Sequence, residues 1–127
     1  MKSKFLIAAG VLGATAILLG AFGAHGLKQV LTADQLVTFE VGVRYQMYHA
    51  LFLLGVGALK GLSDKAQNTI LGLTVVGVLL FSGSIYLLST GLAGDASKIL
   101  GPITPIGGLS LTMAWLILLI QGLKSKS

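Results

Sequence analysis

Long apolar stretches without a charged residue limit, more than any other feature, how this chain can fold. The first, residues 5–24, contains no Asp, Glu, Lys or Arg. Twenty helical residues cover about 30 Å at about 1.5 Å per residue, which is the thickness of the hydrocarbon core of a bilayer. Only 10% of the 127 residues are charged, whereas soluble domains average about 25%. The chain lacks the polar surface of a soluble globule, and we expect an integral membrane protein.

Four apolar stretches predict an all-α fold, a four-helix transmembrane bundle with an interfacial helical extension before the second span. We expect a single domain over residues 1–127, with spans at about 5–24, 41–59, 69–91 and 105–123. Residues 32–35, Thr-Ala-Asp-Gln, have the pattern of a capping box at a helix start. A helix that begins near Ala33 would first lie in the interface and then enter the membrane.

The first apolar stretch has two further properties. Small residues recur at three- and four-residue steps on one helical face, which lets a neighbouring helix approach closely. They are Ala9, Gly13, Ala16, Gly20 and Ala24. Lys2 and Lys4 ahead of the stretch would also suit a signal peptide, although the apolar run is long for that alternative.

The fourth span is expected to follow a loop over residues 91–102. Thr104 and Pro105 are typical of a helix start, with threonine as the N-cap and proline in the first turn. Trp115 lies midway along this span, and we interpret it as a packing residue.

Lysine and arginine are distributed unevenly between the two sides of such a bundle. Four spans put both termini on the same side as the connection near residue 60. That side holds six basic residues and the other side three: Lys2, Lys4, Lys60, Lys65, Lys124 and Lys126 against Lys28, Arg44 and Lys98. Because basic residues are retained in the cytoplasm, both termini are predicted to be cytoplasmic in a multi-pass protein of the cell membrane. No helix or loop gathers enough basic residues to follow a phosphate backbone, so the expected partner is the lipid bilayer and not nucleic acid.

Most candidate site residues lie within residues 39–50, at the mouth of the second span. Glu40 and Arg44 stand four residues apart with the acid first, the favourable order for a helical ion pair. One interpretation is that the pair neutralises itself and anchors the helix at the interface. The other is a binding or relay site for an anionic head group or a small ion, because ionisable groups inside membranes are often functional. Tyr45 and Tyr48 are interpreted as interfacial aromatic residues.

Two histidines are further ligand or relay candidates. His49 would lie about 13 Å deeper than Glu40 along a helix, near the middle of the membrane. There it could bond to Ser82 or Ser84 of another helix, or carry a proton. His25 would lie at the outer end of the first span, and this difference in depth argues against a metal or haem site. Since the chain has no cysteine and no recognisable nucleophile–base–acid set, we expect no cofactor and no enzyme activity.

Four motifs occur in a recognisable order: GAFGAHGL at 20–27, YQMYHA at 45–50 after Gly42, FSGSIY at 81–86 and TPIGG at 104–108. In these motifs the chain resembles, over nearly its whole length, the family labelled domain of unknown function 423. The resemblance implies a small multi-pass protein of the cell membrane, and it implies no reaction, substrate or catalytic residue. The expected topology puts the four motifs between mid-membrane and the non-cytoplasmic side, so they could converge into one polar cluster.

Two functional hypotheses follow. The favoured one is a non-enzymatic accessory or scaffold protein, in which the polar cluster organises the bundle and contacts lipid, a partner helix or a second copy. The alternative is a small oligomeric transporter or channel subunit that uses Glu40, Arg44 and His49 as an ion or proton path. A water-accessible cavity that reaches His49 would favour transport, and a dry, close-packed bundle would favour the scaffold.

Overall fold

The structure, a computed structural model, describes residues 1–125 as an up-and-down helical bundle. Four α-helices follow one another: α1 (Ser3–His25), α2 (Ala33–Ala58), α3 (Asp64–Ser89) and α4 (Ser97–Ser125). Two short 3-10 helices, η1 (Leu27–Gln29) and η2 (Gly94–Ala96), precede α2 and α4. The described residues contain no strand, so the predicted all-α bundle is confirmed. The predicted start of the second helix is also confirmed, because Thr32 and Gln35 form a complete capping box at the start of α2.

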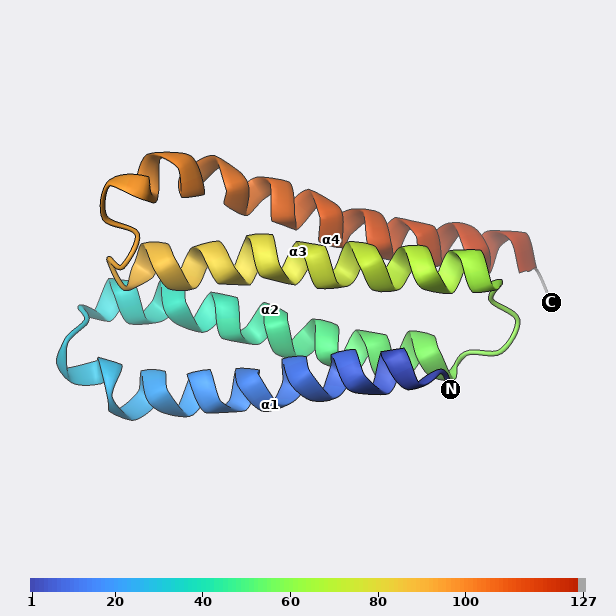
Figure 1. The fold of residues 1–127 in the computed structure, drawn as a ribbon, viewed down its shortest axis with the longest axis horizontal. Coiled ribbons are helices and arrows are strands. Elements are labelled where there is room, and N and C mark those ends of the chain that lie inside the picture. Colours follow the sequence, from blue (N-terminus) through green and yellow to red (C-terminus); the bar gives the residue numbers. More distant parts are fainter. Residues whose placement is uncertain (126–127) are drawn as a thin grey trace.

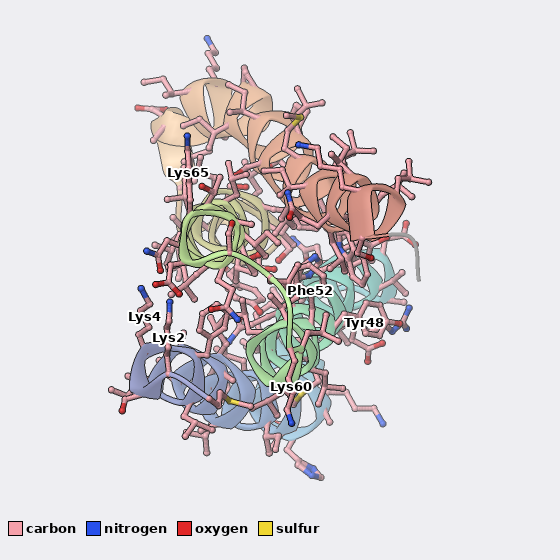
Figure 2. All side chains as sticks on the ribbon, turned by 90° about the vertical axis from the view of Figure 1, so that its right-hand side faces the viewer. Lys2, Lys4, Tyr48, Phe52, Lys60 and Lys65 are labelled. Atoms are coloured by element: carbon pink, nitrogen blue, oxygen red, sulfur yellow. The ribbon has the colours of Figure 1, made fainter. Side chains whose placement is uncertain are left out.

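The helices alternate in direction, so that chemically different segments gather at the two ends (Figure 1). The N-terminus, the α2–α3 connection and the end of α4 lie at one end, which we call the lysine end. It carries Lys2, Lys4, Lys60, Lys65 and Lys124, and Figure 2 looks at the bundle from this end. Lys126, also predicted for this side, lies outside the described residues. The 3-10 helices η1 and η2 lie at the opposite end, which we call the η end.

Three segments are long and apolar enough to cross a membrane: Ser3–Gln29, Asp64–Ser89 and Gly94–Ser125. Helix α2 is as long as α3, with 26 residues each, but polar side chains interrupt its apolar sequence. It lies between α1 and α3 and packs against both. That α2 also crosses the membrane, as the predicted second span, therefore stays a prediction, and its place between α1 and α3 favours it.

The predicted start of the fourth helix is wrong. Helix α4 begins at Ser97, and both Pro102 and Pro105 lie inside it. Proline lacks an N–H and therefore usually marks a first turn, but helices that cross membranes tolerate it because neighbouring groups satisfy the freed carbonyls. Thr104 is accordingly not an N-cap, and the loop expected over 91–102 is replaced by η2 and the first turns of α4.

Glycine contacts define the register of α1 against α2: Gly57 faces Phe5, Gly13 faces Ala50, Gly20 faces Val43 and Gly23 faces Phe39. The two residue numbers of each pair add up to 62 or 63. The apolar stretch 5–24 of α1 therefore lies beside residues 39–57 of α2, and the middle of that stretch lies beside Tyr48. Four of the five predicted small residues occupy this interface, whereas Ala24 is exposed and Gly23 takes its place.

Candidate functional site

A buried amide connects three helices. Gln46 of α2 is 4% exposed. Its Nε2 donates hydrogen bonds to the Leu12 carbonyl, at 2.9 Å, and to Thr15 Oγ1, at 2.6 Å, both on α1. The Tyr86 hydroxyl of α3 donates to Gln46 Oε1 at 2.6 Å. Both amide N–H groups and the amide oxygen thus have partners, so this group is satisfied inside the bundle.

The two candidate serines of α3 bind two different helices. Ser82 donates to the Gly42 carbonyl of α2 at 2.7 Å. Ser84 exchanges a hydrogen bond with the Thr104 hydroxyl of α4 and also reaches the carbonyl of Phe81. Both serines are buried. The expectation that one of them contacts His49 is wrong, because each hydroxyl is used at another level of the bundle.

His49 of α2 bonds instead to its own helix and to α4. Its Nδ1 lies 2.6 Å from the Tyr45 carbonyl, and the Trp115 Nε1 donates to its Nε2 at 3.1 Å. An indole N–H can only donate and a carbonyl can only accept. The arrangement therefore fits a neutral imidazole with its proton on Nδ1. Trp115 packs against Phe52 with ring centroids 4.0 Å apart, so it is a packing residue as expected and a hydrogen-bond donor as well.

These side chains belong to an aromatic cluster on the side of the bundle formed by α2 and α4: Tyr45, Tyr48, His49, Phe52, Phe81 and Trp115. His49 and Phe52 are buried, but Tyr45 is 41%, Trp115 47% and Tyr48 52% exposed. Figure 2 shows Phe52 between α2 and α4 and Tyr48 on the outer side of α2. The cluster thus has a buried half that joins two helices and an open half on the lateral surface.

Glu40 and Arg44 form the expected ion pair, with Glu40 Oε2 3.6 Å from an Arg44 guanidinium nitrogen. The side chains are 58% and 59% exposed, respectively. By the register, Glu40 lies at the end of the apolar stretch of α1, and Arg44 lies one helical turn deeper. Together with three further exposed residues of the same helix they form what we call the α2 face: Glu40, Arg44, Tyr45, Tyr48 and Leu51.

His25 is not brought together with the other candidates. It is exposed at the end of α1 and takes part in none of these contacts. Within residues 1–125 no group of three or more His, Asp or Glu side chains could hold a metal ion. The four sequence motifs converge only in part, since their serines, Thr104 and the tyrosine of α3 join the bundle interior while Arg44 and Tyr48 face outward.

Sequence reasoning missed the most connected residue, Gln46, and its partners Thr15 and Tyr86. A signal was present, because a single amide in an apolar helix needs partners for three hydrogen-bonding groups. What the sequence did not contain was the register that brings Thr15 and Tyr86 to the same level as Gln46.

Several cavities open on the surface of the described residues, among them four at the two ends of the bundle. One of about 460 Å³ lies at the η end and is lined almost entirely by apolar side chains of α1, η1, α2 and α3. Three others, of about 470, 350 and 320 Å³, lie at the lysine end. His49 lines none of these four cavities.

Comparison with known proteins identifies the family. The model of the family described as "Protein of unknown function (DUF423)" matches residues 19–108. A "UPF0382 membrane protein" of Haemophilus influenzae is 41% identical over 128 residues, covering 100% of this chain and 99% of the relative. The "UPF0382 membrane protein YwdK" of Bacillus subtilis is 39% identical over 122 residues, with 94% and 96% covered. No solved structure matches. The chain is a small integral membrane protein that belongs to the DUF423 family of uncharacterised membrane proteins.

Proposed function

We propose that this protein is a non-enzymatic accessory or scaffold protein of the cell membrane, which associates with another transmembrane helix through its α2 face. The observation that carries the proposal is the lateral exposure of polar and aromatic side chains of α2 beside the apolar stretch of α1. Tyr48, 52% exposed, lies beside the middle of the apolar stretch of α1. This placement is unusual for a tyrosine that faces only lipid, since tyrosine is enriched at the membrane–water interfaces.

The inward polar groups support a structural role for the bundle interior. Gln46, Ser82 and His49 each bond across to another helix, over distances of 2.6 to 3.1 Å. Hydrogen bonds between helices in a membrane contribute about 0.6 kcal/mol each on average. These groups therefore hold the bundle together, and none of them needs an external ligand to be satisfied.

The outward groups have no comparable support within one copy. Among the described residues no hydrogen-bond partner is found for the hydroxyls of Tyr45 and Tyr48, and the one polar partner found for the Arg44 guanidinium is Glu40. Ionisable groups inside membranes usually face a protein interior or a water-filled cavity, because exposure to lipid is costly. Aromatic residues and arginine are also enriched in protein–protein interfaces. A second helix against the α2 face would remove both the charged pair and the hydroxyls from lipid.

The transport hypothesis has less support. Both ring nitrogens of His49 are engaged inside the bundle, and the Glu40–Arg44 pair lies on its outside. An ion path through these three residues would therefore have to form between copies of the chain. Purified protein in liposomes that carries out pH-dependent ion flux, with loss of flux in a His49→Ala variant, would favour transport over the accessory role.

Site-specific photo-crosslinking tests the accessory role. A photoreactive amino acid replaces Tyr48, and in a matched control it replaces Ile17, which is 65% exposed on α1 at a similar depth. In intact membranes we expect the residue at position 48 to give a discrete protein adduct and the residue at position 17 to give lipid adducts only. Equal protein labelling at both positions, or none at either, would contradict the proposal.

A further inference from the structure

A cavity with mostly polar lining residues lies at the lysine end, between the start of α3 and the end of α4. Its volume is about 350 Å³, and it is lined by Ser63, Lys65, Ala66, Thr69, Ile117, Gln121 and Lys124. Two lysines, Lys65 of α3 and Lys124 of α4, therefore line one cavity. We call it the lysine pocket, and it involves neither the α2 face nor the aromatic cluster.

The chemistry of the lysine pocket suits a phosphate. Lys65 and Lys124 supply charged donors, and the amide of Gln121 supplies a neutral donor. The hydroxyl of Ser63 accepts a hydrogen bond from the Ala66 N–H, so its own proton stays available to donate. Among residues 1–125, which the structure describes, no carboxylate lines the pocket.

The one acidic side chain close by in sequence does not compete with a phosphate for the lysines of the pocket. Asp64 precedes Lys65 but bonds to Lys2, the N-cap residue of α1, at 2.7 Å. Figure 2 shows Lys2 on the side of α3 that faces α1, whereas Lys65 lies on the side toward α4. Among the described residues, the lysine end carries five lysines and this single carboxylate. The local excess of positive charge therefore favours a ligand with a net negative charge.

The apolar part of the lining limits the class of ligand further. Ala66 and Ile117 are the apolar residues of the lining, and exposed apolar residues lie near Ile117 along α4, namely Ile120, Leu116 and Met113. A free phosphate would make no favourable contact with these apolar residues. A phospholipid would place its phosphate among the lysines and a hydrocarbon chain against Ile117, at the depth where lipid head groups meet the ends of the helices.

We propose that the lysine pocket binds the head group of an anionic phospholipid, with the phosphate between Lys65 and Lys124. Basic pockets between transmembrane helices on the cytoplasmic side are suited to such head groups, and each lysine near an anionic surface contributes enough to change binding severalfold. The site ties the ends of α3 and α4 to the leaflet that the lysine distribution predicts to be cytoplasmic.

Native mass spectrometry of the full-length protein tests the assignment, with phosphatidylglycerol, phosphatidylcholine and inorganic phosphate as separate probes. The variant Lys65→Gln with Lys124→Gln removes both charges of the pocket. The control Lys28→Gln with Lys98→Gln removes the same charge at the η end, where phosphatidylglycerol is equally accessible. Unfolding curves of both double variants, followed by Trp115 fluorescence, check that each one is folded.

We expect the wild type to retain phosphatidylglycerol in preference to phosphatidylcholine. The pocket variant should lose about tenfold to thirtyfold in phosphatidylglycerol affinity, and the control less than about threefold. Equal losses in both variants would show unspecific charge attraction and overturn the proposal. It would also be overturned if millimolar inorganic phosphate displaced the lipid, since that result identifies a free-anion site.

Discussion

Replacing Gly107 by alanine tests how closely α4 packs against α3. A Cβ at Gly107 would lie 2.4 Å from the backbone nitrogen of Phe81 and 2.7 Å from the carbonyl carbon of Leu80. Ordinary contacts begin at 3.4 Å, so one of the two helices would have to move by about 1 Å. Both obstructing atoms are backbone, and no change of side-chain rotamer can relieve the clash.

The consequences of that movement can be estimated from the neighbouring contacts. Ser110, one turn along α4, donates to the Leu73 carbonyl at 2.7 Å. A displacement of about 1 Å would stretch this bond beyond hydrogen-bonding distance. Overpacking of this kind costs about 1–3 kcal/mol, and the lost interhelical bond adds about 0.6 kcal/mol. We therefore expect Gly107→Ala to lower the free energy of unfolding by about 2–4 kcal/mol.

The adjacent glycine provides the control. A Cβ at Gly108 would meet only the Phe81 ring, at 3.5 Å, so Gly108→Ala adds the same methyl group at ordinary contact distance. Unfolding by sodium dodecyl sulfate in mixed micelles can be followed by the fluorescence of Trp115, the single tryptophan, which packs against Phe52 of α2. Equal unfolding free energies for the two variants, within about 0.5 kcal/mol, would refute the close crossing of α3 and α4.

The same unfolding assay checks three further predictions. Gln46→Leu leaves the Tyr86 hydroxyl without its acceptor and should lower the free energy of unfolding by about 1–3 kcal/mol; less than about 0.3 kcal/mol would contradict the network. Thr32→Ala removes the N-cap of α2 and should cost about 1 kcal/mol, whereas Thr32→Ser should restore most of that loss. Asp64→Asn should leave the midpoint unchanged, because its bond to Lys2 is exposed to solvent and exposed ion pairs contribute little.

The helical frame could be predicted because it depends on local and compositional signals. Apolar stretches indicate the helices, and the capping box at Thr32 gives the start of α2 correctly. The same type of signal failed at Thr104 and Pro105. A Thr-Pro pair can start a helix or lie inside one. The path of the chain through η2 into α4 shows that this pair lies inside the helix.

The site could be predicted only as a set of residue types. Glu40 and Arg44 pair within one helix, so their spacing was sufficient. The partners of His49 and Gln46 lie 66 and 31 to 40 residues away. Which residues meet is decided by glycine contacts that fix how far each helix slides along the next, and a single sequence does not specify that offset.

The polar residues of α2 point in two directions, inward and outward, and both groups contribute to making this helix the least apolar of the four. Gln46 and His49 point inward, where hydrogen bonds to α1, α3 and α4 offset the cost of burying them. Arg44 and Tyr48 point outward, and the bundle gains no contact between helices from their polar ends. Leucine at position 48 would serve a solitary bundle in lipid at least as well. A single copy of the bundle does not need a polar outward face on α2. We therefore interpret the low hydropathy of α2 as an indication that another helix packs against this face.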